Sequence, residues 1–262
     1  MTDTIFKILY REAHGFLMNN TERKFMENQL ACSKCTKAKS LKEVYRCLLD
    51  ALIFTRRMKE VIGPVESLEQ SLYGFDPRKI QSHYGDQWEK MYDDLAKGTN
   101  HVMHWQSFCR GAVSGASFLN QLSSIDKFHT FLKSFQNNEM TTAVLPLLFQ
   151  KVVHGLSFPM ACAFLYGIGY TGYISPDPKV KSLLKDIGII ESMDNYEALK
   201  ILTVICRVNQ KPMPYVHNLF WLIGNGTLSK DGNKDLKYRK EFIGHIIPIL
   251  NCFSYRPQQI QT

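Results

Sequence analysis

Residues 144–184 read VLPLLFQKVVHGLSFPMACAFLYGIGYTGYISPDPKVKSLL, and the rest of the chain is organised around this stretch. Apolar residues recur with helical spacing from Val144 to His154, which predicts a helix. Gly155-Leu156-Ser157 interrupts this pattern, and Phe158 to Ile168 resumes it. Ser157 is the expected N-cap of the second helix, with Pro159 in its first turn. The sequence therefore predicts two helices joined by a tight turn.

A third helix is predicted to follow the loop at Tyr170–Pro176. Asp177 and Pro178 are a capping residue and a first-turn proline, the usual start of a helix. Elsewhere the apolar segments also show helical spacing, including one segment from Ser40 to Lys59, and none alternates over the length of a strand. These patterns predict an all-α protein.

The order and spacing of these elements resemble the helix-hairpin-helix DNA glycosylases. Val153-His-Gly-Leu-Ser-Phe-Pro-Met-Ala161 matches the hairpin, and Pro176-Asp-Pro-Lys-Val180 stands where the family keeps its catalytic aspartate. The resemblance covers about Trp105 to Gly224. It implies a glycosylase-like helical barrel in residues 101–226. Residues 1–100 are a helical region without assignment, and residues 227–262 are expected to pack back, so that both ends form an additional helical lobe.

The hairpin is the expected DNA-phosphate site. A tight turn that leads into a helix presents unpaired N–H groups and the positive end of the helix dipole to an anion. Gly155 and Ser157 would contribute this backbone, although the family has a second glycine where Ser157 stands. Lys179 and Lys181 would contact further phosphates, or else form a solvated helix face. An ordinary helical hairpin is the alternative.

Asp177 is the expected catalytic residue. Cleavage of an N-glycosidic bond builds positive charge on the sugar, which a fixed carboxylate stabilises. The same group could orient or deprotonate the attacking water. Its other interpretation is a plain helix cap. Bifunctional relatives carry a lysine just after the hairpin, where this chain has Pro159, so the resemblance implies a monofunctional enzyme that leaves an abasic site.

Base excision requires that the target base leave the stack. The resemblance places Gln121 in a turn from which a polar side chain fills the space that the flipped base leaves in the duplex. The alternative is that Gln121 is an ordinary residue at a helix end. Aromatic residues would line the base pocket, or else belong to the core; the candidates are Trp105, Tyr173 and Trp221.

The composition of the chain limits which binding partners and which cellular compartment are expected. The 262 residues are 45% hydrophobic and carry a formal charge of +8, which suits a polyanion such as double-stranded DNA. No apolar run approaches the roughly 18 residues that span a bilayer, and residues 1–16 do not resemble a signal peptide. We therefore expect a cytoplasmic protein, or a nuclear one in a eukaryote, that is monomeric and has no membrane contact.

The cysteines are expected to be free thiols, with a zinc site at Cys32 and Cys35 as the alternative. Cys32 and Cys35 have the spacing of half a zinc site without a second half, and Cys252 alone remains near the C-terminus, where iron–sulphur relatives keep four cysteines. No cofactor is expected, apart from a monovalent cation that relatives bind beneath the hairpin.

The functional hypothesis is a DNA repair glycosylase that flips out a damaged or modified base and hydrolyses its N-glycosidic bond. A related enzyme that acts on modified phage bases in defence is one alternative. A non-catalytic DNA-binding protein that retains the hairpin is another, and a helical protein-interaction domain is a third.

Overall fold

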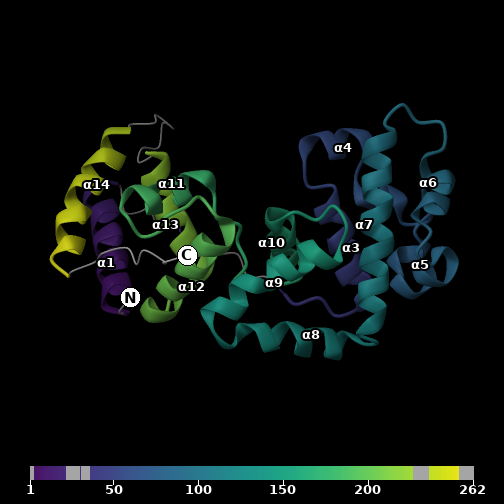
Figure 1. Cartoon of the computed structure of the whole chain (residues 1–262), viewed down its shortest axis with the longest axis horizontal. Helices are drawn as coiled ribbons and strands as arrows, with labels where there is room; N and C mark the ends of the chain where they lie inside the picture. Colours follow the sequence, from purple (N-terminus) through teal and green to yellow (C-terminus); the bar gives the residue numbers. More distant parts are fainter. Residues whose placement is uncertain (1–2, 22–29, 31–35, 227–235, 254–262) are drawn as a thin grey trace, which may run out of the picture. The chain divides into compact units, whose positions relative to one another are not determined.

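The computed structural model describes residues 3–21, 30, 36–226 and 236–253. Every regular element in these residues is helical, which confirms the all-α prediction (Figure 1). The Cys32–Cys35 pair lies outside the described residues.

The chain divides into two compact units by its internal contacts. One unit combines Met1–Lys34 with Thr171–Thr262, and the other is Cys35–Tyr170. The division therefore does not fall at the predicted boundaries after residues 100 and 226. The physical reason is packing: the helices before residue 100 that follow Cys35 pack on the long helix after it, whereas the first helix packs with the last ones.

The unit Cys35–Tyr170 is built around one long helix, α7 (Val102–Gln121), which contacts α3, α4, α5, α6 and α9. Helix α10 packs against α3 and α9, which brings the hairpin into this unit. The other helices of the unit are α3 (Leu41–Leu52), α4 (Arg56–Ile62), α5 (Pro77–Tyr84), α6 (Trp88–Ala96), α8 (Ile125–Ser134), α9 (Glu139–Val152) and α10 (Phe158–Gly167), with 3-10 turns at Val65–Leu68, Tyr73–Phe75 and Phe135–Asn137.

The segment Ser40–Lys59 is not one helix, as its apolar spacing predicted, but two. Helix α3 ends at Leu52, and α4 begins after Thr55, whose side chain accepts a hydrogen bond from the Met58 N–H at 3.2 Å. A threonine that caps a new helix competes with helix continuation, and apolar periodicity does not register this effect.

The other unit joins the two ends of the chain. Helix α1 (Asp3–Asn20) packs on α12 (Asn195–Asn209), α13 (Met213–Asn225) and α14 (Leu236–Asn251), as expected for a lobe that combines both termini (Figure 1). Helix α11 (Pro178–Asp186) lies against α13. Residues Phe242, Ile246 and Leu250 of α14 are buried, and α14 contacts α1, α11 and α13.

Arg239 ties three helices of this unit together. Its guanidinium donates to the Gly224 carbonyl at 3.0 Å, to the Ser182 hydroxyl at 2.7 Å and to the Asp186 carboxylate. Its side chain is only 14% exposed, so these bonds are shielded from water. They hold α14, α13 and α11 in one arrangement.

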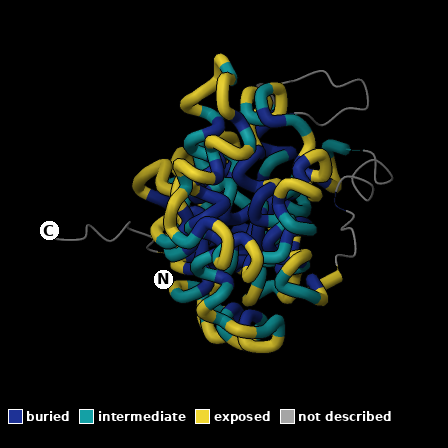
Figure 2. Tube along the Cα trace, turned by 90° about the vertical axis from the view of Figure 1, so that its right-hand side faces the viewer, coloured by how far each residue is buried: buried dark blue, intermediate teal, exposed yellow. Residues whose placement is uncertain are grey.

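Buried and exposed positions recur along the helices as expected of amphipathic segments. Figure 2 shows buried, intermediate and exposed stretches along the chain. Among the described residues, no helix has the combination of length and apolar composition needed to cross a membrane.

Candidate functional site

The predicted hairpin forms between α9 and α10. Gly155 has φ +75°, a left-handed conformation that side chains other than that of glycine rarely adopt. The turn is fixed on α7, because the His154 N–H donates to the Ser114 hydroxyl at 2.9 Å. Leu156 and Phe158 are buried beneath it, whereas His154 and Gly155 are exposed. The backbone of the turn is therefore held rigidly at a surface.

Ser157 is the N-cap residue of α10, as predicted, although its side chain makes no capping hydrogen bond. Its backbone has the extended conformation of a cap (φ −77°, ψ 165°), so the helix begins there through geometry alone. No side-chain cap thus competes for the first-turn N–H groups of α10. This leaves the end of the helix open to an external anion.

Asp177 is the N-cap of α11, as predicted. Its Oδ1 accepts a hydrogen bond from the Lys179 N–H at 2.7 Å, and its backbone is extended (φ −61°, ψ 146°). Pro176 and Pro178 flank it; each proline fixes its own φ and restricts the residue before it. The carboxylate is half-buried at the positive end of the helix dipole.

A hollow of about 240 Å³ opens beside this carboxylate. Asp177 lines it together with Trp221 and Leu222 of α13, and with His217 and Asn218 one turn earlier on the same helix. The hollow therefore combines a carboxylate, a large aromatic ring and two further polar groups. Of the three aromatic candidates from the sequence, Trp221 lies with Asp177 in this hollow.

His217 and Asn218 are the site residues that sequence reasoning missed. They precede Trp221 by four and three positions, which places them on the same face of α13. With Trp221 as a pocket candidate, the helical spacing of three and four residues would have indicated His217 and Asn218 as further pocket residues.

His217 contacts the backbone that carries Asp177. The Asp177 N–H donates to its Nε2 at 3.4 Å, and His217 as a whole is 9% exposed. Burial lowers the pKa of His217 below its usual range; hydrogen bonds with Asn218 and the Ser175 backbone and the charge of Asp177 oppose this effect. The imidazole is therefore neutral near pH 7.

The lowered pKa of His217 predicts a loss of stability in acid. An unfolded chain takes up the proton near pH 6.5, whereas the folded protein resists it, so the free energy of unfolding falls as the pH drops below that value. We expect His217→Gln to reduce the difference in unfolding free energy between pH 7.5 and pH 5.5, measured by urea denaturation. The same measurement is made on His14→Gln for comparison. This variant should also reduce the difference in unfolding free energy between the two pH values, because burial also lowers the pKa of His14. An unchanged difference in His217→Gln would contradict the prediction.

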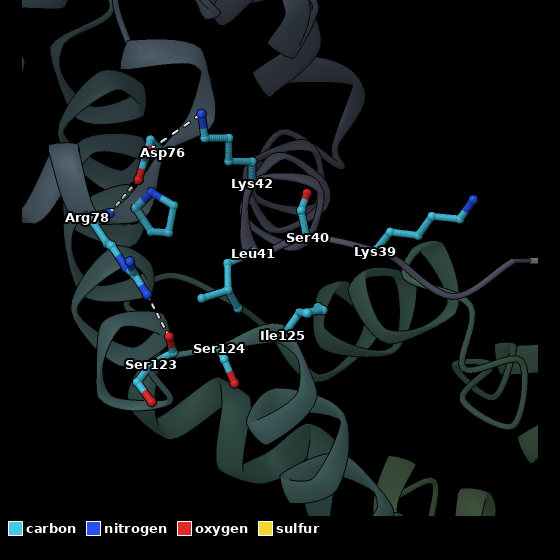
Figure 3. Close-up of a pocket in the computed structure, with 10 residues that line it drawn as sticks. Lys39, Ser40, Leu41, Lys42, Asp76, Arg78, Ser123, Ser124 and Ile125 are labelled. Atoms are coloured by element: carbon cyan, nitrogen blue, oxygen red, sulfur yellow. Dashed lines mark hydrogen bonds and ion pairs between the residues drawn. The ribbon is translucent and has the colours of Figure 1, made fainter.

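Gln121 is the last residue of α7 and is exposed at its end. Helix α5 braces the turn that follows. Arg78 donates to the Ser123 carbonyl at 2.6 Å, and the Asn120 amide donates to the Pro77 carbonyl at 3.1 Å (Figure 3 shows the first of these bonds). Gln121 thus ends a helix whose last turn and following residues are hydrogen-bonded to α5.

A second hollow, of about 350 Å³, lies under this turn where α3, α5 and α8 begin (Figure 3). Its cations already have partners: Lys42 is 3.5 Å from the Asp76 carboxylate, and Arg78 bonds to Ser123. The Lys39 side chain extends away from the other residues drawn. We therefore interpret these contacts as support for the Gln121 turn.

The remaining candidates do not line either hollow. Trp105 is 8% exposed in the core of the unit Cys35–Tyr170, and Tyr173 is fully buried in the other unit. Lys179 is exposed on α11, but the Lys181 ammonium donates to the Asn195 side chain at 2.7 Å. Of the two lysines, Lys179 is the one without such a partner.

Among the described residues, no three histidine, cysteine, aspartate or glutamate side chains gather as a metal site. Burial raises the pKa of the Cys109 and Cys206 thiols to about 12, so neither is a thiolate near neutral pH.

Comparison with known protein families, with curated sequences and with solved structures finds no match for this chain.

Proposed function

We propose that this chain is a monofunctional DNA glycosylase, which flips a damaged or modified base out of duplex DNA and hydrolyses its N-glycosidic bond. One observation carries the proposal: the Asp177 carboxylate and the Trp221 side chain line the same small hollow. A planar base that rests against the indole would place its glycosidic bond near a fixed anion.

The hollow suits this chemistry in size and polarity. At about 240 Å³ it is smaller than pockets for drug-sized ligands, which measure about 300–1,000 Å³, so it matches one small planar group. Asp177 supplies the negative charge that a cationic sugar needs in the transition state, or the acceptor that orients water. Asn218 also lines the hollow, and its side chain hydrogen-bonds to His217.

The unit Cys35–Tyr170 supplies two features that a DNA-binding surface needs. The Gly155–Ser157 turn offers backbone N–H groups to a phosphate, and the braced Gln121 offers a side chain to fill the base stack. The net charge of +8 favours the same partner.

A base-release screen tests the proposed activity. Duplexes that each carry one damaged or modified base are incubated with the protein, and free base and abasic sites are quantified. We expect release from at least one duplex and, because Pro159 stands at the lysine position, no adduct on borohydride reduction. DNA binding without any release would favour the non-catalytic DNA-binding protein.

The hairpin makes a separate prediction about affinity. Gly155→Val forces a β-branched residue into φ +75°, a strain of about 1–3 kcal/mol, and should distort the phosphate-binding turn. We expect duplex affinity at low salt to fall by about tenfold, and wild-type affinity to fall steeply as salt rises. Fluorescence anisotropy measures both quantities.

The matched control for this variant is Gly98→Val. Gly98 also has a left-handed conformation (φ +85°), and a Cβ atom there would meet nothing within 4 Å, but it lies between α6 and α7. Its backbone strain is therefore similar, and its duplex affinity should equal that of the wild type. Equal affinities for all three proteins would remove the hairpin from the interface.

A further inference from the structure

The segment that carries Asp177 has little conformational freedom of its own. Pro176 and Pro178 restrict the backbone on both sides, and the bond from the Lys179 N–H holds Oδ1 of the carboxylate. What these local contacts do not determine is where the whole segment lies relative to the hollow. That position depends on a contact from another helix.

His217 of α13 provides this contact. Its Nε2 accepts the Asp177 N–H at 3.4 Å, and the Ser175 backbone also hydrogen-bonds to the ring. The imidazole thus engages the backbone on both sides of Pro176. A neutral imidazole has one donor and one acceptor nitrogen, so acceptance at Nε2 assigns the ring proton to Nδ1.

The helix that carries His217 is itself held against α11. A Cβ atom on Gly224 of α13 would lie 2.7 Å from the Lys179 carbonyl oxygen, so the two backbones meet there without room for a side chain. Arg239 bonds to the Gly224 carbonyl and to two side chains of α11. The imidazole therefore has a defined position relative to the start of α11.

We propose that His217 is a positioning residue, whose neutral Nδ1–H imidazole holds the Ser175–Asp177 backbone so that the Asp177 carboxylate faces the hollow. This inference rests on the proposed function, since it assigns the carboxylate to catalysis. Protonation of the ring would remove the acceptor from the Asp177 N–H. It would also place a positive charge beside the carboxylate and weaken its stabilisation of a cationic sugar.

Among the described residues, the charge that acts on this ring is that of Asp177; its other partners, Asn218 and the Ser175 backbone, are uncharged. The catalytic rate should therefore follow the ring's protonation. It should stay flat through pH 6.5 and fall only at lower pH, because the ring titrates below its usual range.

The first experiment reads the bond directly in the full-length protein. Long-range ¹H–¹⁵N correlation spectra of ¹⁵N-labelled protein report the tautomer of His217, and a scalar coupling across the N–H···N bond reports contact with the Asp177 amide. We expect an Nδ1–H ring coupled to that amide. An Nε2–H ring overturns the inference whether or not the protein releases a base, so this result is independent of the proposed function.

The second experiment measures base release by variants at this position. Gln places an amide oxygen near the position of Nε2 and accepts the same bond, whereas Leu is apolar. A small misplacement of a catalytic group commonly lowers rates by about 100-fold. We therefore expect kcat to fall by about 10- to 100-fold in His217→Leu with little change in KM. We expect His217→Gln to retain kcat within about threefold and to lose the acid limb of the pH profile.

His14→Leu is the control for the loss of a partly buried histidine in the same unit; His14 lies outside the hollow, and this variant should keep full activity. Equal losses in His217→Gln and His217→Leu would show that the ring acts through packing alone and would overturn the inference. Full activity in His217→Leu would do the same. If His217→Leu does not fold, the spectra and the Gln variant decide the matter.

Discussion

Asp177→Asn should abolish most base release while leaving the protein folded. Asparagine has nearly the shape of aspartate and is also a good N-cap, so the bond from the Lys179 N–H and the start of α11 should persist. The variant loses the charge that stabilises a cationic sugar in a partly desolvated site. Loss of one such preorganised interaction lowers rates by about 100- to 1,000-fold, and single-turnover base release measures this change.

Asp194→Asn is the matched control for this substitution. Asp194 caps α12 in the same unit, where its carboxylate accepts the Glu197 N–H at 2.9 Å, and it does not line the hollow. Its variant should release base at the wild-type rate, and both variants should melt within a few degrees of the wild type. A wild-type rate in Asp177→Asn would show that the carboxylate is only a cap, and unfolding would show that its charge is needed by the fold.

Gly224→Ala should destabilise the protein and slow the reaction together. The new Cβ would lie 2.7 Å from the Lys179 carbonyl oxygen and 3.1 Å from its carbon, and a backbone cannot yield as a flexible side chain does. Overpacking of this kind costs about 1–3 kcal/mol. Because Lys179 lies in the first turn after Asp177, relief of the clash would also move the carboxylate away from the hollow.

Gly244→Ala provides the comparison in a neighbouring helix. Gly244 lies within α14, and a Cβ there would meet nothing within 4 Å. Alanine is favoured over glycine inside helices by up to about 1 kcal/mol, so this variant should be as stable as the wild type or more so. Urea denaturation measures both variants. Equal stability of Gly224→Ala and the wild type would mean that α11 and α13 have room to separate.

The start of α11 was readable from sequence because capping is local: Asp177 accepts a bond from a residue two positions later. Glycine at position 155 likewise reflects a left-handed turn that one residue determines. Such features depend on a few consecutive residues, and the prediction of α11 with Asp177 as its cap was correct for this reason. The start of α9 was missed, since the helix begins at Glu139, where Asn138 caps it through Thr141, and not at Val144.

Sequence patterns gave a wrong prediction where the same residues are compatible with two local structures. The apolar pattern from Ser40 to Lys59 predicted one helix, but Thr55 caps a second one. Ser157 is the N-cap residue of α10, as predicted, yet its side chain makes no capping bond. Residue type specifies what a side chain can do, and its rotamer and neighbours determine whether it does so.

The sequence by itself determined that the chain is helical, where α11 begins, and that Asp177 caps it, because each depends on residues a few positions apart. Tertiary packing decided that the first helix joins the last ones in one unit, and that Trp105 is buried while Trp221 lines a hollow with Asp177. It also decided that His217 meets the Asp177 N–H, a contact across forty positions of sequence. Two tryptophans that both lie in helices become a core residue and a hollow-lining residue only when separate helices pack. No pattern of neighbouring residues in the sequence specifies how those helices pack.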